Sequence, residues 1–256
     1  MSEGKINLQN QPKVEEFLRC YTADPGHKLV YMDFSALEPH VCTFYSRDEK
    51  MMSLYGPDAK RNDIYLFFGA STNVYGPQIL DTGYDPDEPT AATLKVAKVS
   101  CGPVRDVLKT VVLGCTYGMG FRLLHAYVNQ SGYPLSLSEA RSMHGDYWSF
   151  FGGIKRFEKK LLREYNDNHG YILNGRGRPL TIFYKKTKDI VNRFVQSTGH
   201  DILMHYLYLL QQIRLRDNIA MRPWMVDEHD ATIWQAKESA VDQACAAYKE
   251  ALDELN

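Results

Sequence analysis

The spacing of hydrophobic and polar residues predicts strands near both ends of the chain. The segment KLVYMDFS, residues 28 to 35, combines β-branched and aromatic residues as is typical of a short buried strand, which ends at an acidic residue. Residues 221 to 237 have the pattern of strand, turn and strand, and an alanine-rich helix is expected to follow them.

Between these strands the spacing of apolar residues is mostly helical. The segments expected to be helical are Pro39 to about Ser71, 93 to 118, 138 to 169 and Thr187 to Arg216. Gly102-Pro103 interrupts the second of them, because proline can open a new helix at its first turn. Turn residues gather in two further places, which predicts a long loop around residues 77 to 89 and a turn at 170 to 178.

Composition and length place the chain among soluble globular proteins. Its 256 residues with 44% hydrophobic content can bury one large core or two modest ones. No stretch approaches the roughly twenty apolar residues that a spanning helix needs, and the N-terminus lacks the apolar core of a signal peptide. The five cysteines form no CxxC pair, which argues against a zinc ribbon or a disulfide framework. We therefore expect a soluble, cytoplasmic protein.

The positive charge is concentrated in one region. The formal net charge is −1, but residues 151 to 216 hold thirteen Lys/Arg against five Asp/Glu. Such a basic zone on a neutral body is what a track for a phosphate backbone would require. A solvated, mixed-charge helix face is the alternative interpretation.

Two acidic segments are candidate cation sites. In DFSALEPHV, Asp33 ends the first predicted strand and Glu38 follows five residues later, where a carboxylate and the neighbouring backbone carbonyl could hold a divalent cation. The alternative is that Asp33 only caps the next helix. In WMVDEHDATIW the acidic cluster should fall at a β-turn; a solvated turn accounts for Asp227 and Glu228, but less well for His229 and Asp230.

A third candidate lies in RDVLKTVVLGCTYG. Arg105, Lys109, Leu113 and Tyr117 follow one another at intervals of four residues, so on an α-helix they form one stripe. This stripe could grip a triphosphate at one end and a base at the other, since arginine suits bidentate phosphate contacts and lysine acts as a point charge. An exposed cationic face beside a packed tyrosine is the alternative.

These three motifs occur in the order and approximate spacing of family A DNA polymerases, the bacterial DNA polymerase I type. DFSALEPHV resembles their motif A, usually DYSQIELR; the series from Arg105 to Gly118 is similar to RxxxKxxxFGxxYG of motif B; HDATIW resembles motif C, usually HDELVF. NLQNQP (7 to 12) and NRFVQSTGHDIL (192 to 203) are similar to the family segments NLQNIP and NAPMQGTAADII. The resemblance runs nearly end to end.

The resemblance implies a catalytic role for two aspartates. Asp33 and Asp230 would bind two Mg²⁺ ions, for which Mn²⁺ could substitute, together with the backbone carbonyl of Phe34. Arg105 and Lys109 would hold the phosphates of the incoming dNTP, and Lys109 would stabilise or protonate the leaving group.

The resemblance also implies how the sugar and base would be selected. Tyr117 would stack near the nascent base pair and, with Glu38, close the space where a ribose 2′-hydroxyl would lie, which favours DNA synthesis over RNA synthesis. Leu113 stands where the family usually has Phe or Tyr, which should alter discrimination against nucleotides that lack a 3′-hydroxyl. Tyr65 stands where the family has a phosphate-binding histidine.

Contacts to primer-template DNA are implied for the residues Lys188, Asn192, Gln196 and His229. Lys188 replaces the usual arginine, so a bidentate contact would become a single-point one. Ala231 replaces the usual motif C glutamate, and Asp227 and Glu228 are the candidates to substitute for it.

The fold implied is α+β, with an antiparallel palm sheet and a helical fingers subdomain. Residues 1–60 would be the N-terminal part of the palm with motif A, 61–170 the fingers with motif B, and 171–256 the C-terminal part of the palm with motif C. No thumb or 3′-5′ exonuclease domain is expected in this chain.

We therefore expect the catalytic subunit of a DNA-templated DNA polymerase that transfers dNMP to a primer 3′-hydroxyl. Because the chain starts with its own methionine just before NLQN, we expect a split bacteriophage polymerase whose second polypeptide carries the thumb and exonuclease; an excised fragment fits as well. Two alternatives are a single-subunit RNA polymerase relative, against which Glu38 argues, and a decayed, non-catalytic DNA-binding module. The joint presence of Asp33, Lys109 and Asp230 argues against decay.

Overall fold

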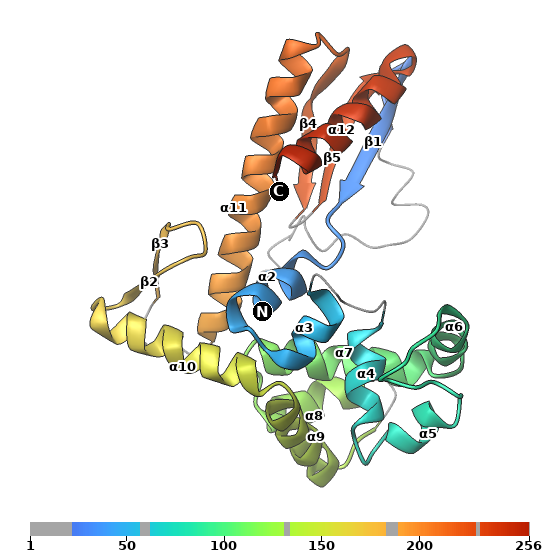
Figure 1. Cartoon of the computed structure of the whole chain (residues 1–256), viewed down its shortest axis with the longest axis vertical. Helices are drawn as coiled ribbons and strands as arrows, with labels where there is room; N and C mark the ends of the chain where they lie inside the picture. Colours follow the sequence, from blue (N-terminus) through green and yellow to red (C-terminus); the bar gives the residue numbers. More distant parts are fainter. Residues whose placement is uncertain (1–21, 57–61, 131–133, 183–188, 229–230, 256) are drawn as a thin grey trace, which may run out of the picture. The chain divides into compact units, whose positions relative to one another are not determined.

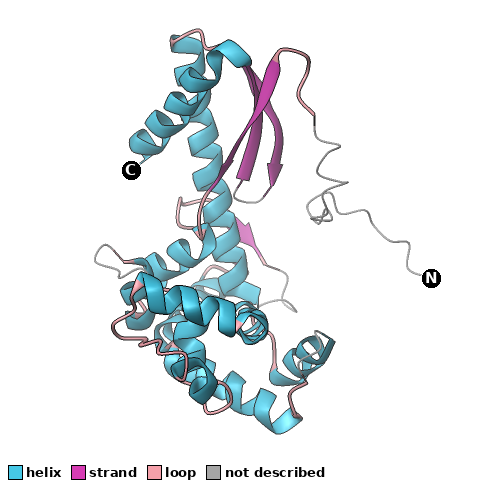
Figure 2. Ribbon diagram, turned by 90° about the vertical axis from the view of Figure 1, so that its right-hand side faces the viewer, coloured by secondary structure: helices cyan, strands magenta, loops and turns pink. Residues whose placement is uncertain are grey.

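The computed structural model describes residues 22–56, 62–130, 134–182, 189–228 and 231–255. Contacts within the chain separate two compact units, one combining Met1–Leu37 with Gly199–Asn256 and the other formed by Glu38–Thr198. Figure 1 labels the elements, and Figure 2 shows that helices make up most of the described chain. The expected palm and fingers boundaries rest on motif positions and stay a prediction.

The first unit is an antiparallel sheet with helices against one face (Figure 1). Its elements are, in sheet order and then along the chain, β1 (His27–Asp33), β5 (Ala231–Lys237), β4 (Met221–Glu228), the part of α11 (Ile190–Arg216) from Gly199 onward, the short 3₁₀ helix η2 (Glu238–Ala240) and α12 (Val241–Leu255). Trp234 is fully buried at the centre of the core that sheet and helices share. The two strands expected within 221–237 and the alanine-rich helix expected to follow them are confirmed.

Alternate residues of strand β1 face the core and the surface. Val30 and Met32 pack against the core of the first unit, whereas Tyr31 between them is 61% exposed. Successive side chains of a strand point to opposite faces, so one face of β1 joins the core and the other stays open. The strand ends at Asp33, as expected, but the expectation that it is buried was wrong, because every residue of β1 is half-buried or exposed.

In the residues that the structure describes, the regular elements of the second unit are helices apart from one small hairpin. Its elements are α2 (Leu37–Ser46), α3 (Glu49–Tyr55), α4 (Ile64–Ala70), α5 (Gly76–Leu80), α6 (Ala91–Ser100), α7 (Gly102–Thr116), α8 (Phe121–Gln130), α9 (Leu137–Phe150), α10 (Gly152–Asp167), β2 (Tyr171–Leu173), β3 (Pro179–Thr181) and the first turns of α11. An aromatic cluster fills its interior, where Phe68, Tyr147 and Phe151 are fully buried and meet ring to ring.

Polar caps decide where several of these helices begin. Asp48 and Asp63 accept backbone N–H groups at the starts of α3 and α4, so the interval expected to be helical from Pro39 to Ser71 is divided, with three separate helices in its described part. The expected interruption at Gly102-Pro103 is confirmed, because α6 ends at Ser100 and α7 starts at Gly102.

Three expectations about the second unit were incomplete. The segment expected to be helical over 138 to 169 holds two helices, α9 and α10, which meet at Phe151. The loop expected around residues 77 to 89 begins with the short helix α5, which has proline in its first turn. The segment expected to be a turn at 170 to 178 contains strand β2, so only residues 174 to 178 connect β2 to β3 in a hairpin. Helix α8 was not expected at all. The α+β class itself is confirmed. No helix among the described residues is both long and apolar enough to cross a membrane.

Asp48 also links distant parts of the second unit. Its second carboxylate oxygen accepts the backbone N–H of Gly153 at 2.6 Å, and a Cβ on Gly153 would lie 2.5 Å from the Asp48 Cα. The start of α10 therefore approaches α3 more closely than any other residue type at position 153 allows.

We predict opposite effects of one substitution at two helical glycines. Gly153→Ala should lower the free energy of unfolding by about 1 to 3 kcal/mol, because the new methyl group collides with the Asp48 backbone. Gly145→Ala, in α9 with nothing within 4 Å of the new Cβ, should raise it by up to about 1 kcal/mol. Urea unfolding measures both, and a destabilisation of equal size at the two positions would contradict the packing described.

Candidate functional site

Helix α7 has one buried and one accessible face. Val104, Leu108, Val111 and Cys115 are buried, and burial raises the pKa of the Cys115 thiol to about 12. On the other face Arg105 and Leu113 are half-buried, Lys109 is exposed, and Tyr117 follows at the C-cap. The stripe predicted from the four-residue spacing is therefore present, since burial of the apolar face leaves these side chains accessible.

The first cation of the stripe is held from two sides. Arg105 donates through Nε and Nη2 to Oδ2 of Asp63, at 2.9 and 2.8 Å. Its guanidinium also lies over the ring of Tyr65, 5.0 Å from the ring centroid. These contacts fix the guanidinium with little freedom.

Asp63 joins three helices. Its side chain is 5% exposed, and its Oδ1 accepts the N–H groups of Tyr65 and Leu66 at the start of α4. Its Oδ2 contacts Arg105 of α7 and also Lys98 of α6, whose Nζ lies 3.3 Å away. Neither Asp63 nor Lys98 was identified from the sequence, because only the folded chain brings residues so far apart together.

Tyr65, which stands where the resembled family has a phosphate-binding histidine, lies beside Arg105. Burial raises the pKa of its hydroxyl, and the nearby Arg105 opposes this shift only in part. The side chain is therefore a neutral phenol at neutral pH and adds no positive charge to the stripe.

The other end of the stripe meets the first turn of α2. The hydroxyl of Tyr117 donates to Oε2 of Glu38, and both side chains are half-buried. A carboxylate in the first turn of a helix is favoured by the helix dipole. These two side chains border a space of about 30 Å³ with Leu113 and Thr116, too small for more than a water molecule. The structure thus brings together Tyr117 and Glu38, the pair for which the family resemblance implies a role in sugar selection.

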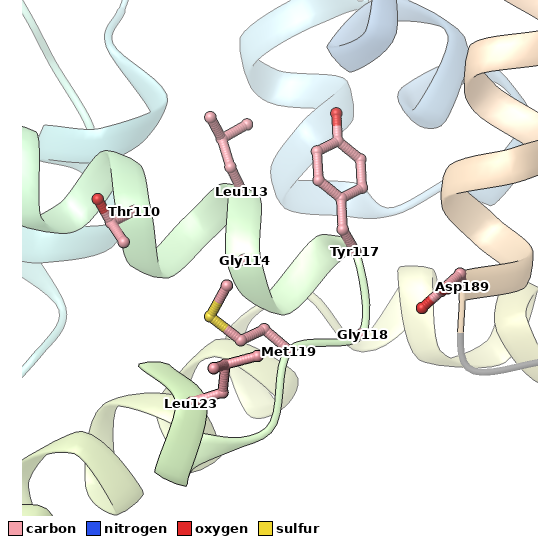
Figure 3. A pocket seen from close by; sticks show the side chains of 8 residues that line it. All are labelled: Thr110, Leu113, Gly114, Tyr117, Gly118, Met119, Leu123 and Asp189. Carbon is pink, nitrogen blue, oxygen red and sulfur yellow. The ribbon is translucent and has the colours of Figure 1, made fainter. Parts of the chain in front are cut away.

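A larger hollow lies beside the C-terminal half of α7. It measures about 360 Å³ and is lined by Thr110, Leu113, Gly114, Tyr117, Gly118, Met119, Leu123 and Asp189. In Figure 3, Leu113 and Tyr117 project from the same side of the helix, and the thioether of Met119 approaches Gly114. Gly118 has a φ of +78°, which turns the chain sharply after Tyr117. The lining is mostly apolar, which suits a flat aromatic group.

The two predicted DNA contacts that are described lie on one helix. Asn192 and Gln196 are one turn apart in α11. The Oδ1 of Asn192 is buried and has no hydrogen-bond partner among the described residues. Gln196 is exposed and borders a hollow of about 330 Å³ together with Arg193 and Ser197. Lys188 lies outside the described residues.

The turn between β2 and β3 carries two arginines that the sequence analysis left without a role. The backbone N–H of Gly175 donates to Thr198, and its carbonyl accepts the Tyr45 hydroxyl at 2.8 Å. Arg176 and Arg178 are exposed on this turn, which these hydrogen bonds hold in place. Alternation of glycine and arginine in NGRGRP could have indicated an anion-binding turn.

Asp33 lies at the end of β1 and is exposed. The register of the sheet pairs it with Ala231, the residue after Asp230 in the sequence. His229 and Asp230 lie outside the described residues. The expectation that Asp227 and Glu228 belong to the turn was wrong, because β4 extends through both and pairs them with Thr232 and Ala231. Within the described ranges, no group of three or more His, Cys, Asp and Glu side chains is arranged to hold a metal ion.

Comparisons with known proteins cover the whole chain. A family model described as DNA polymerase family A matches residues 1–256. A DNA polymerase of Mycobacterium phage D29 is 28% identical over 194 residues, which cover 76% of this chain and 27% of the relative. DNA polymerase I of Chloroflexus aurantiacus is 23% identical over 268 residues, which cover all of this chain and 25% of the relative. The chain thus spans about a quarter of the length of these relatives.

A solved structure is similar over almost the whole chain. It is described as the POL domain of Pol1 from M. smegmatis in complex with DNA primer-template and dNTP. The TM-score is 0.74 at 17% identity, and the match covers 98% of this chain and 41% of the other. This likeness shows a shared fold.

We predict that Asp63→Ala lowers the free energy of unfolding by about 2 to 4 kcal/mol, because α4 loses its cap and Arg105 its buried partner. Asp85→Ala is the matched control, since Asp85 caps an exposed turn through Asp87 and Glu88 and should cost about 1 kcal/mol or less. Urea unfolding of both variants measures the difference, and equal losses would show that the Asp63 contacts are not structural.

Proposed function

The chain belongs to DNA polymerase family A, and we propose that it is the palm and fingers portion of a DNA-templated DNA polymerase. It would transfer dNMP from a dNTP to the 3′-hydroxyl of a primer, in the cytoplasm of a host cell if it comes from a bacteriophage. The observation that carries the proposal is the α7 stripe, which runs from two cations to a tyrosine hydrogen-bonded to Glu38. Both ends of a nucleotide could be recognised along this one helix.

The cationic end of the stripe suits a triphosphate. Arg105 uses Nε and Nη2 for Asp63, so its other amino group is available for phosphate oxygens. Lys109 is exposed on the next turn and would act as a point charge that stabilises or protonates the leaving pyrophosphate. Tyr65 would support this contact by holding the guanidinium of Arg105.

The other end suits a deoxyribose and a base. The Glu38 carboxylate, held by Tyr117, would obstruct a 2′-hydroxyl and leave too little room for a ribonucleotide. A base could stack on Tyr117 at the apolar hollow beside it. Leu113 lies on the same side of the helix and would contact the sugar with an aliphatic group.

Divalent cations would bind at the end of β1. Asp33 is exposed there, and its pairing with Ala231 supports a role beside Asp230, since Asp230 directly precedes Ala231 in the sequence. Two carboxylates and the Phe34 carbonyl are hard oxygen donors of the kind that Mg²⁺ prefers, and Mn²⁺ could substitute. When bound, these ions would lower the pKa of the primer hydroxyl and stabilise the leaving phosphate.

Primer-template DNA would lie along the basic region. We propose contacts from Asn192, whose side-chain oxygen has no hydrogen-bond partner within the described ranges, and from Gln196. Lys188 and His229 are proposed from the motif resemblance alone, and Arg176 and Arg178 from their exposed turn. A second polypeptide that carries a thumb and a 3′-5′ exonuclease is also part of the proposal.

We predict that Asp33→Ala and Asp230→Ala each lower Mg²⁺-dependent single-nucleotide primer extension on the order of a thousandfold, because each removes a metal ligand from the chemical step. Primer-template binding should change by less than about twofold, since phosphate contacts dominate it. Asp227→Ala is the control and should retain most activity. Wild-type extension rates in the two aspartate variants would refute the proposed function.

We predict that Glu38→Ala raises the use of ribonucleotides relative to deoxyribonucleotides by roughly 10- to 100-fold, because space opens beside the sugar. Tyr117→Phe removes only the hydroxyl that holds Glu38 and should give a smaller increase. Glu49→Ala removes an acidic residue from the first turn of α3 and serves as a control that leaves the ratio unchanged. The ratio of kcat/KM values for matched nucleotides measures all three, and an unchanged ratio in Glu38→Ala would remove this carboxylate from sugar selection.

A further inference from the structure

Two cations share one carboxylate oxygen beside the start of α7. Lys98 Nζ lies 3.3 Å from Oδ2 of Asp63, and Arg105 Nη2 lies 2.8 Å from the same atom. Because both contacts end on one oxygen, the two cationic groups lie within a few ångströms of each other. They repel, and one carboxylate can neutralise only one of them.

The exposure of the three side chains differs in a consistent way. Asp63 is 5% exposed, Arg105 is 29% exposed and Lys98 is 44% exposed. The negative charge is therefore covered, while the positive charges reach the surface. Lys109 adds a further exposed cation on the next turn of α7. A surface that presents three cations over one hidden carboxylate attracts a polyanion.

Lys98 lies on a helix that is packed in place, and its ammonium group has N–H donors that the contact with Asp63 does not use. Leu94 and Ala97 are buried on the other side of α6, and Thr90 and Thr93 form a capping box at its start. An ammonium group has three N–H donors, and the contact with Asp63 takes only one of them. The remaining donors can reach phosphate oxygens on the surface.

We propose that Lys98 is a third cationic contact for the triphosphate of the incoming nucleotide, held beside Arg105 by Asp63. This inference rests on the proposed function, because it takes Arg105 and Lys109 as the phosphate-binding pair. Lys98 then completes a row of three cations, which matches a triphosphate better than two. Asp63 is the positioning residue, since it touches both cations and is itself covered.

If Lys98 had a purely structural role, its loss would affect phosphate binding differently. In that case the lysine would only tie α6 to α4 and α7 through Asp63. A half-exposed ion pair of this kind contributes little to stability. Loss of Lys98 would then leave the affinity for phosphates unchanged.

The test is equilibrium binding of inorganic tripolyphosphate to the purified chain. Lys98→Ala should weaken binding roughly three- to tenfold, because a charge-assisted contact is lost at a half-exposed position. Lys98→Arg should restore most of the affinity. Lys95→Ala removes the same charge from α6 at an exposed position and should change the affinity by less than about twofold, because salt screens an exposed charge that makes no direct contact.

The inference is overturned if the wild-type chain does not bind tripolyphosphate, or if Lys98→Ala has no larger effect than Lys95→Ala. The result is separable from the proposed function by primer extension. Lys98-dependent tripolyphosphate binding without any extension would retain the Lys98 contact and reject the polymerase assignment. If the chain extends primers but Lys98→Ala binds tripolyphosphate as the wild type does, the polymerase assignment is retained and the Lys98 contact is rejected. In an active enzyme, Lys98→Ala should raise the KM for dNTP by the same factor and leave primer-template affinity unchanged.

Discussion

The buried carboxylate of Asp63 is the interaction on which the candidate site depends. One oxygen starts α4, and the other holds Arg105 of α7 and Lys98 of α6. A carboxylate that is only 5% exposed is costly unless its oxygens are occupied, so these donors and the acid require one another. The same contact therefore stabilises the junction of three helices and sets the position of the cations at its surface.

Helix α7 connects this junction to the residues that would distinguish deoxyribose from ribose. Its apolar face is buried, which fixes the opposite stripe toward the accessible side with Lys109 one turn beyond Arg105. The helix ends at Tyr117, whose hydroxyl meets Glu38 on α2. Phosphate binding and sugar selection would thus lie two to three turns apart on one rigid element, which explains how both ends of a nucleotide could be recognised together.

The parts of this account that were predicted from the sequence rest on local periodicity. The strand ending at Asp33, the break at Gly102-Pro103 and the α7 stripe each follow from spacing within one element, and each is present. The features that the sequence did not predict depend on contacts between residues far apart in the chain or on pairing between strands. Asp63 meets Arg105 across 42 positions of sequence, and no local pattern marks that pairing. Asp227 and Glu228 look like turn residues by composition, but pairing with β5 extends β4 through them.

The most direct test of the central claim is an experimental structure of the chain with primer-template DNA, a non-hydrolysable dNTP and Mg²⁺. The account predicts the triphosphate against Arg105 and Lys109, the sugar beside Glu38 and Tyr117, and metal density at Asp33. A nucleotide bound away from α7, or metal density at other carboxylates with Asp33 bare, would contradict it.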